Sequence, residues 1–169
     1  MGTLTPAQYY DNVITIVSGS NGMHDLQYRA APATGETFDR GSLVSLDGSG
    51  NLIAGCAGTA MPMWALNSVD DFDVNADVGN FSGGFIATIP ATGGYEIFTT
   101  EFDTGGTYTY NTLLTAALTT DVGLVTPAAG ANYNDLIIVG IVSQGETTGI
   151  YDQAILYFWP LFIPAIDIT

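Results

Sequence analysis

The residues best spaced for chemistry lie between positions 70 and 79, where the chain reads DDFDVNADVG. Oxygen-bearing side chains recur there at every second position, and several such oxygens can surround one calcium ion. The residues with this spacing are Asp71, Asp73, Asn75 and Asp77. A calcium loop of the helix–loop–helix type also needs a glycine and a bidentate glutamate, but Ala76 and Ser82 stand at those positions. The pattern therefore favours a solvated acidic loop, with a calcium site of another type as the alternative.

Groups suited to catalysis are few, because the chain has one histidine, His24, one cysteine, Cys56, and no lysine. Cys56 lies in the small-residue segment AGCAG without an adjacent cation that would lower its pKa. One imidazole and one thiol also cannot build a structural zinc site. Glu96 and Glu101 could supply the carboxylate pair of a glycoside hydrolase, but any two acids look paired in so acidic a chain. We predict no catalysis, no cofactor and no metal site, and keep the hydrolase as the weakest alternative.

The charge balance excludes two classes of partner. The 169 residues carry 2 Lys+Arg against 17 Asp+Glu, a formal net charge of −15, and both cations are arginines, Arg29 and Arg40. Neutralising phosphates or binding anionic lipids needs several cations, so we expect neither nucleic acid nor a membrane as partner. The most apolar stretch, residues 154–166, is too short to span a bilayer and contains Pro160 and Pro164. No secretory signal is visible at the N-terminus, so we expect synthesis in the cytoplasm.

The elements that must position these residues are strands. Short runs rich in Val, Ile, Thr, Tyr and Phe alternate with Gly, Asn, Asp and Pro, which is typical of a sandwich or barrel. The predicted strands are 12–17, 25–30, 42–46, 51–55, 62–66, 85–89, 95–100, 122–126, 136–143 and 154–159. The segment DGSG predicts a hairpin turn at residues 47–50, and LLTAAL at 113–118 fits a short helix or a strand. We predict an all-β fold, a compact β-barrel or β-sandwich with an extended N-terminal arm and at most one short helix.

The N-terminal region, residues 1–34, is turn-rich apart from one apolar run, VITIV. It fits an arm that adds a strand to the sheet of another chain, preceding a β-rich domain over 35–169, or an ordinary first hairpin. Aromatic residues cluster at both ends of the chain, where a monomer has little need of so much apolar area. We predict that partner contacts are made by Tyr9, Tyr10, Ile14, Ile16, Phe158 and Trp159.

Residues 36–159 resemble bacteriophage head decoration (capsid cement) proteins, of the small β-rich kind broadly similar to the lambda head-stabilising protein. The resemblance rests on the segments ETFDRGSLVSLDGSGNLIAGC, MPMWALNSVD, LIIVGIVSQG and AILYFWP. It implies a structural virion protein, a homotrimer on the outer surface of an icosahedral capsid, which stabilises the shell by bridging capsomers. It also implies that the arm contacts the major capsid protein and that synthesis occurs in the host cytoplasm. The bulky C-terminal LFIPAIDIT and the acidic loop at 70–77 depart from the family pattern.

A carbohydrate- or calcium-binding β module, of a fibre or lectin-like kind, is the competing interpretation. Such a module would stack sugars on Trp64 or Trp159 and on tyrosines, and would hold calcium in the acidic loop. Size in solution separates the two interpretations, because a lone module runs as a monomer and a decoration protein forms trimers or binds capsids.

Overall fold

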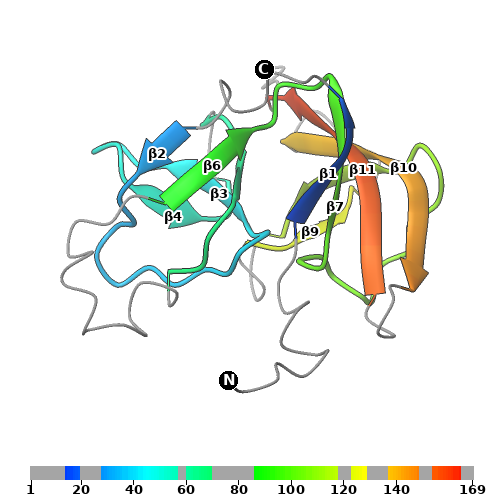
Figure 1. The fold of residues 1–169 in the computed structure, drawn as a ribbon, viewed down its shortest axis with the longest axis horizontal. Coiled ribbons are helices and arrows are strands. Elements are labelled where there is room, and N and C mark those ends of the chain that lie inside the picture. Colours follow the sequence, from blue (N-terminus) through cyan, green and yellow to red (C-terminus); the bar gives the residue numbers. More distant parts are fainter. Residues whose placement is uncertain are drawn as a thin grey trace, which may run out of the picture.

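The computed structural model describes seven stretches of the chain, and within them it contains eleven β-strands and no helix (Figure 1). The described residues are 14–19, 28–56, 60–69, 86–117, 123–128, 137–148 and 154–164. The strands are β1 (Ile14–Gly19), β2 (Tyr28–Ala30), β3 (Leu43–Leu46), β4 (Leu52–Ala54), β5 (Met63–Ala65), β6 (Ile86–Pro90), β7 (Tyr95–Thr99), β8 (Leu113–Ala116), β9 (Val125–Pro127), β10 (Ile138–Thr148) and β11 (Ala154–Ile163).

These strands form two sheets whose ladders are antiparallel. The six-stranded sheet has the order β1-β7-β11-β10-β8-β9, and the five-stranded sheet has the order β2-β6-β5-β3-β4. The chain crosses between the sheets after β6, because β7 belongs to the six-stranded sheet (Figure 1). The sheets are not closed into a barrel, so the all-β prediction is confirmed and the architecture is that of a β-sandwich.

The structure tests two local predictions, the helix or strand at 113–118 and the hairpin turn at 47–50. The segment at 113–118, which fitted a helix or a strand, contains strand β8, held between β10 and β9. The turn between β3 and β4 is closed by Asp47, whose Oδ1 accepts the backbone N–H groups of Ser49 and Asn51, each at 2.8 Å. The hydrogen bond from the Asn51 backbone lowers the pKa of Asp47, and Gly50 takes a positive φ of 83°. The predicted hairpin is therefore confirmed.

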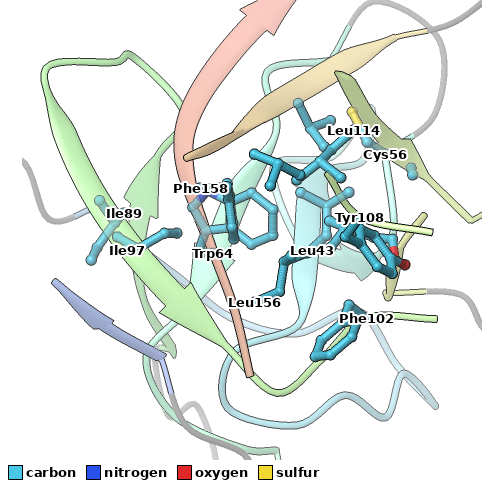
Figure 2. Packing of buried hydrophobic residues seen from close by; sticks show 14 of the residues in the cluster. Leu43, Cys56, Trp64, Ile89, Ile97, Phe102, Tyr108, Leu114, Leu156 and Phe158 are labelled. Carbon is cyan, nitrogen blue, oxygen red and sulfur yellow. The ribbon is translucent and has the colours of Figure 1, made fainter. Parts of the chain in front are cut away.

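The main core lies between the two sheets and is built from side chains of both (Figure 2). Trp64 of β5 and Phe158 of β11 are completely buried, and their rings meet edge to face with centroids 4.9 Å apart. Leu43 of β3 and Leu114 of β8 belong to the same cluster. Each fully buried large apolar side chain contributes roughly 1.5–3 kcal/mol, so this layer is the main source of stability.

A second apolar cluster covers the other face of the five-stranded sheet. Val44, Met63 and Ile86 face away from the main core and pack with Phe38 and Leu52. Phe38 lies outside the strands, in the connection between β2 and β3, and covers this face. Because both faces are apolar, the strands of this sheet show little alternation between buried and exposed residues.

Both strands of the N-terminal region pair within their own chain. β1 runs along β7, from Ile14 opposite Thr99 to Gly19 opposite Tyr95, and β2 runs along β6. Within the predicted arm over residues 1–34, β1 therefore pairs with β7 and β2 with β6 of the same chain, while the prediction also allowed pairing with a neighbouring chain. The division of the chain at residue 34 stays a prediction.

Candidate functional site

The aromatic run near the C-terminus divides between the core and the surface. Side chains alternate along β11, so Leu156 and Phe158 point inward while Tyr157 and Trp159 point outward. The prediction that Phe158 contacts a partner is therefore wrong, because its ring is completely buried against Trp64. Trp159 keeps 37% of its surface exposed and lies on the outer face of the six-stranded sheet.

A second exposed ring stands beside Trp159. Tyr110 is 63% exposed, and its ring lies at 82° to the indole of Trp159 with centroids 6.2 Å apart. We call these two residues the aromatic corner, because two nearly perpendicular rings bound one region of the surface. An edge-to-face pair of this kind is a favoured geometry worth about 0.5–1.5 kcal/mol, so the two rings hold each other in place.

The turn that carries Tyr110 is fixed by hydrogen bonds on both sides. Thr112 Oγ1 accepts the backbone N–H of Thr109 at 3.1 Å, and the backbone of Asn111 donates to Val142 O at 3.0 Å. The backbone of Val142 in turn donates to Thr112 O at 2.8 Å. Asn111 has a φ of 68°, and it is the only non-glycine residue of the described stretches with a positive φ. Asparagine adopts this left-handed conformation more readily than other non-glycine residues, so it suits the turn.

A nearly buried carboxylate lies on the same outer face. Glu96 and Phe98 of β7 project away from the core, opposite to Ile97, and Glu96 is only 8% exposed. Ser143 Oγ donates to Glu96 Oε1 at 2.5 Å, and Gln144 Nε2 donates to the same oxygen at 3.0 Å. These bonds fix the orientation of the carboxylate, since charge-assisted hydrogen bonds are the stronger ones.

A bulge in β10 makes this contact across the sheet possible. β11 lies between β7 and β10, and the register of β10 against β11 shifts between Val142 and Gly145. The shifted residues, Ser143 and Gln144, are the two that reach over β11 to Glu96. A bulge redirects side chains in this way. We call Glu96, Ser143 and Gln144 the Glu96 cluster.

The Glu96 cluster and the aromatic corner are neighbours in the sheet register. Ile97 pairs with Phe158 across the ladder between β7 and β11, so the next residues along, Glu96 and Trp159, both project on the outer face. On the other side of the cluster, Phe98 and Tyr157 form a tilted ring pair with centroids 5.5 Å apart. This face therefore offers aromatic rings on both sides of a carboxylate, a combination that binds cations, sugars or protein side chains.

The second predicted carboxylate, Glu101, has a different environment beyond the end of β7. Burial raises its pKa, a hydrogen bond from Thr100 Oγ1 at 3.1 Å lowers it, and the charge of Asp39 raises it further. Glu96 is bound instead by residues of β10. The two acids thus have separate hydrogen-bond partners rather than a shared one.

The other residues singled out from the sequence are buried in the core, lie on β1, or lie outside the described residues. Trp64 is completely buried, so it cannot serve as a stacking platform, and Cys56 is a buried thiol whose pKa burial raises to about 11. Ile14 and Ile16 lie on β1, opposite Thr99 and Ile97. Outside the described residues lie Tyr9, Tyr10, His24 and the acidic loop at 70–77.

Sequence reasoning did not single out Tyr110, Ser143 or Gln144. For Tyr110 a signal was present, since Thr109 and Thr112 can cap a turn and Asn111 tolerates a positive φ. The partners of Glu96 carry no such signal, because 47 and 48 residues separate Ser143 and Gln144 from it.

Comparison with protein families, with curated proteins and with solved structures gives no significant match. Among the described residues, no group of three or more His, Cys, Asp and Glu side chains is arranged to hold a metal ion. In the same stretches, no helix is long and apolar enough to cross a membrane.

Proposed function

We propose that this chain is a structural virion protein that binds the outer surface of an icosahedral capsid and stabilises the shell by bridging capsomers. The exposed aromatic corner of Tyr110 and Trp159 carries the proposal. Aromatic residues are enriched at the centres of protein interfaces, where a few of them supply most of the binding free energy. The partners in this proposal are the major capsid protein and other copies of the chain in a homotrimer.

The charge of the chain supports a position on the outside of the shell. A net charge of −15 would repel packaged nucleic acid on the inner face of a capsid. The fold adds a second support, because a rigid β-sandwich with a large apolar core needs no partner in order to fold. A preformed protein of this kind stabilises the assembled shell by mass action, by about 2.7 kcal/mol per site at a concentration of 100 Kd.

The experiment uses empty capsids assembled from the major capsid protein that the same genome encodes. The full chain is added, its bound copies are counted after sedimentation, and the melting temperature of the capsid is measured with and without it. We expect saturable binding and a higher melting temperature. Capsids that sediment without the protein at its highest soluble concentration would overturn the proposal.

A matched pair of variants tests the role of the aromatic corner. Trp159 and Tyr28 are similarly exposed, at 37% and 43%, but Tyr28 lies on β2 of the other sheet. We expect Trp159→Ala to weaken capsid binding about 30-fold, as for a central interface residue, and Tyr28→Ala to leave it within about twofold. Equal losses for the two variants would show that the aromatic corner is not the contact.

A carbohydrate-binding module is the second candidate, and one observation favours it. The exposed indole of Trp159 lies on the same face of the sheet as the Glu96 carboxylate, which the amide of Gln144 binds, and sugar-binding sites combine stacking rings with such polar groups. Titration of the protein with neutral oligosaccharides, followed by indole fluorescence, tests this candidate. Binding that Trp159→Ala abolishes, together with a monomeric protein that ignores capsids, would establish the module instead.

A further inference from the structure

We propose that the aromatic corner and Glu96 together form a receptor for a cationic side chain, an arginine or lysine presented by the partner protein. The proposal rests on the proposed function only for the identity of that partner, the major capsid protein. It assigns to the partner a basic contact surface, which the proposed function alone does not require.

The two rings of the aromatic corner are placed to hold a cation. Trp159 and Tyr110 stand at 82° to one another and remain 37% and 63% exposed. A cation is attracted to the face of an aromatic ring when it lies within about 6 Å of the centroid, and tryptophan attracts it most strongly. Because the two rings meet at a near right angle, one guanidinium group can stack on the face of the indole while the edge of the guanidinium contacts the phenol ring.

A carboxylate, that of Glu96, lies on the same face of the sheet as the rings. Both hydrogen bonds that the structure shows for Glu96 end on Oε1, from Ser143 and from Gln144. The second oxygen, Oε2, is therefore the one left to pair with a donor from outside. A carboxylate that is only 8% exposed interacts more strongly with such a donor than a solvated one, because less water screens it.

The cation must come from the partner, because the cations of the chain itself lie on or beside the five-stranded sheet. Its cationic side chains are those of Arg29 and Arg40, and it has no lysine. Arg29 lies on β2 of the five-stranded sheet, and Arg40 lies just before β3 of the same sheet. The remaining charge of the chain is acidic, with 17 Asp+Glu, so its field attracts a basic surface and repels an acidic one.

The receptor is formed before any partner arrives. Asn111 holds a positive φ beside Tyr110, and backbone hydrogen bonds to and from Val142 fix the turn against β10. A preformed site loses less conformational entropy on binding than a site that must be ordered first.

The test titrates the full chain with a flexible Gly-Ser peptide that carries arginines. Matched peptides carry lysine, the neutral isostere citrulline, or glutamine at the same positions. Binding is followed by the NMR signals of the two indole N–H groups, which Trp159→Phe assigns. We expect the arginine and lysine peptides to shift the Trp159 signal, and citrulline and glutamine to leave it unchanged. An equal response to citrulline, or a response to neutral oligosaccharides alone, would overturn the proposal.

Variants then separate the two parts of the receptor. We expect Tyr110→Leu to weaken binding of the arginine peptide about 2–5-fold, as for an exposed cation–π contact. Glu96→Gln keeps the shape of the side chain and its bonds to Ser143 and Gln144 while removing the charge, so it should weaken binding and flatten its salt dependence. Tyr28→Leu, on the other sheet, should change nothing. Unchanged binding by both Tyr110→Leu and Glu96→Gln, with native melting curves, would contradict the receptor.

Capsid binding distinguishes this inference from the proposed function. If capsids bind the wild type and the two receptor variants equally, the proposed function stands and the cation receptor is wrong. If the arginine peptide binds as expected while capsids do not, the receptor stands and the virion role is wrong. If capsid binding falls with rising salt in the wild type but less steeply in Glu96→Gln, both are supported.

Discussion

The indole of Trp64 on β5 meets the ring of Phe158 on β11 edge to face, and this contact joins the two sheets of the sandwich. Trp159, the residue that follows Phe158, points the opposite way and lies on the surface. Adjacent aromatic residues on one strand thus perform separate tasks, one in folding and one in the proposed contact with a partner.

Truncating these two neighbours should have unequal effects on stability. We expect Phe158→Ala to lower the free energy of unfolding by about 3–5 kcal/mol, because it removes a fully buried ring and leaves a cavity. Trp159→Ala, at a surface position, should cost about 1 kcal/mol or less. Urea denaturation followed by circular dichroism measures both. Equal losses would mean that the core does not depend on the Phe158 ring as described.

A glycine beside the same ring should not tolerate a side chain. A Cβ added at Gly140 would lie 2.7 Å from Cδ2 of Phe158, and the buried ring has no room to move. We expect Gly140→Ala to lower the free energy of unfolding by about 1–3 kcal/mol through overpacking. Gly48→Ala is the control, because a Cβ there meets nothing within 4 Å. A Gly140→Ala protein as stable as this control would contradict the close approach.

Glu101 should make the protein more stable at acidic pH than at neutral pH. Burial raises its pKa from the ordinary value of 4.5. Its stabilising contribution is therefore complete below the unfolded-state pKa and is lost as the pH rises through the higher, folded-state pKa. Glu101→Gln should be more stable than the wild type at pH 7, and the difference should vanish below about pH 4. Thermal melting across this pH range measures it, and a constant difference would contradict the assignment.

For Asp47 we expect the opposite dependence of stability on pH. Hydrogen bonds from the turn, chiefly from the backbone of Asn51, lower its pKa from 3.8. Its contribution is present above the unfolded-state pKa and is lost as the pH falls through the folded-state value. Asp47→Asn should therefore melt at a lower temperature than the wild type at neutral pH, and the two should converge in acid. Equal melting temperatures of Asp47→Asn and the wild type at neutral pH would show that the charge of Asp47 does not stabilise the turn.

The thiol of Cys56 should be inert while the protein is folded. Burial raises its pKa to about 11, and its Sγ donates to Ala60 O at 3.2 Å. Because the thiolate is the reactive form, a thiol reagent at pH 8 should label Cys56 slowly in buffer and quickly in concentrated urea. Labelling at similar rates in both conditions would show that the thiol is not covered.

The strands were predictable because their pattern is local. β-branched and aromatic runs marked most of them, and the sequence around Asp47 and Gly50 predicted the hairpin between β3 and β4. The direction of each aromatic side chain was not predictable. Phe158 and Trp159 are adjacent and similarly apolar, and only the packing of the opposite sheet decides which of them is buried.

The end of β11 and the neighbours of β7 also depend on distant parts of the chain. A strand was expected to stop before Pro160, yet β11 runs to Ile163, because its ladder with β10 continues from Pro160 opposite Gly140 to Ile163 opposite Ile138 after its ladder with β7 has ended at Phe158. β7 lies between β1 and β11, from opposite ends of the sequence. The Glu96 cluster rests on that arrangement, so no local pattern could have predicted it.

The position of β1 at the edge of its sheet has a mechanical consequence. Among the described strands β1 has one neighbour, β7, whereas β11 has β7 on one side and β10 on the other. Tension applied between the two ends of the chain would therefore act on two strands of unequal resistance. β1 can detach from β7 one hydrogen bond at a time, whereas β11 can detach only after its ladders with both β7 and β10 are broken. In an optical trap we expect a short extension at low force, when β1 detaches, followed by a single rupture of the sandwich at higher force. We therefore expect β1 to be the first strand to detach under tension.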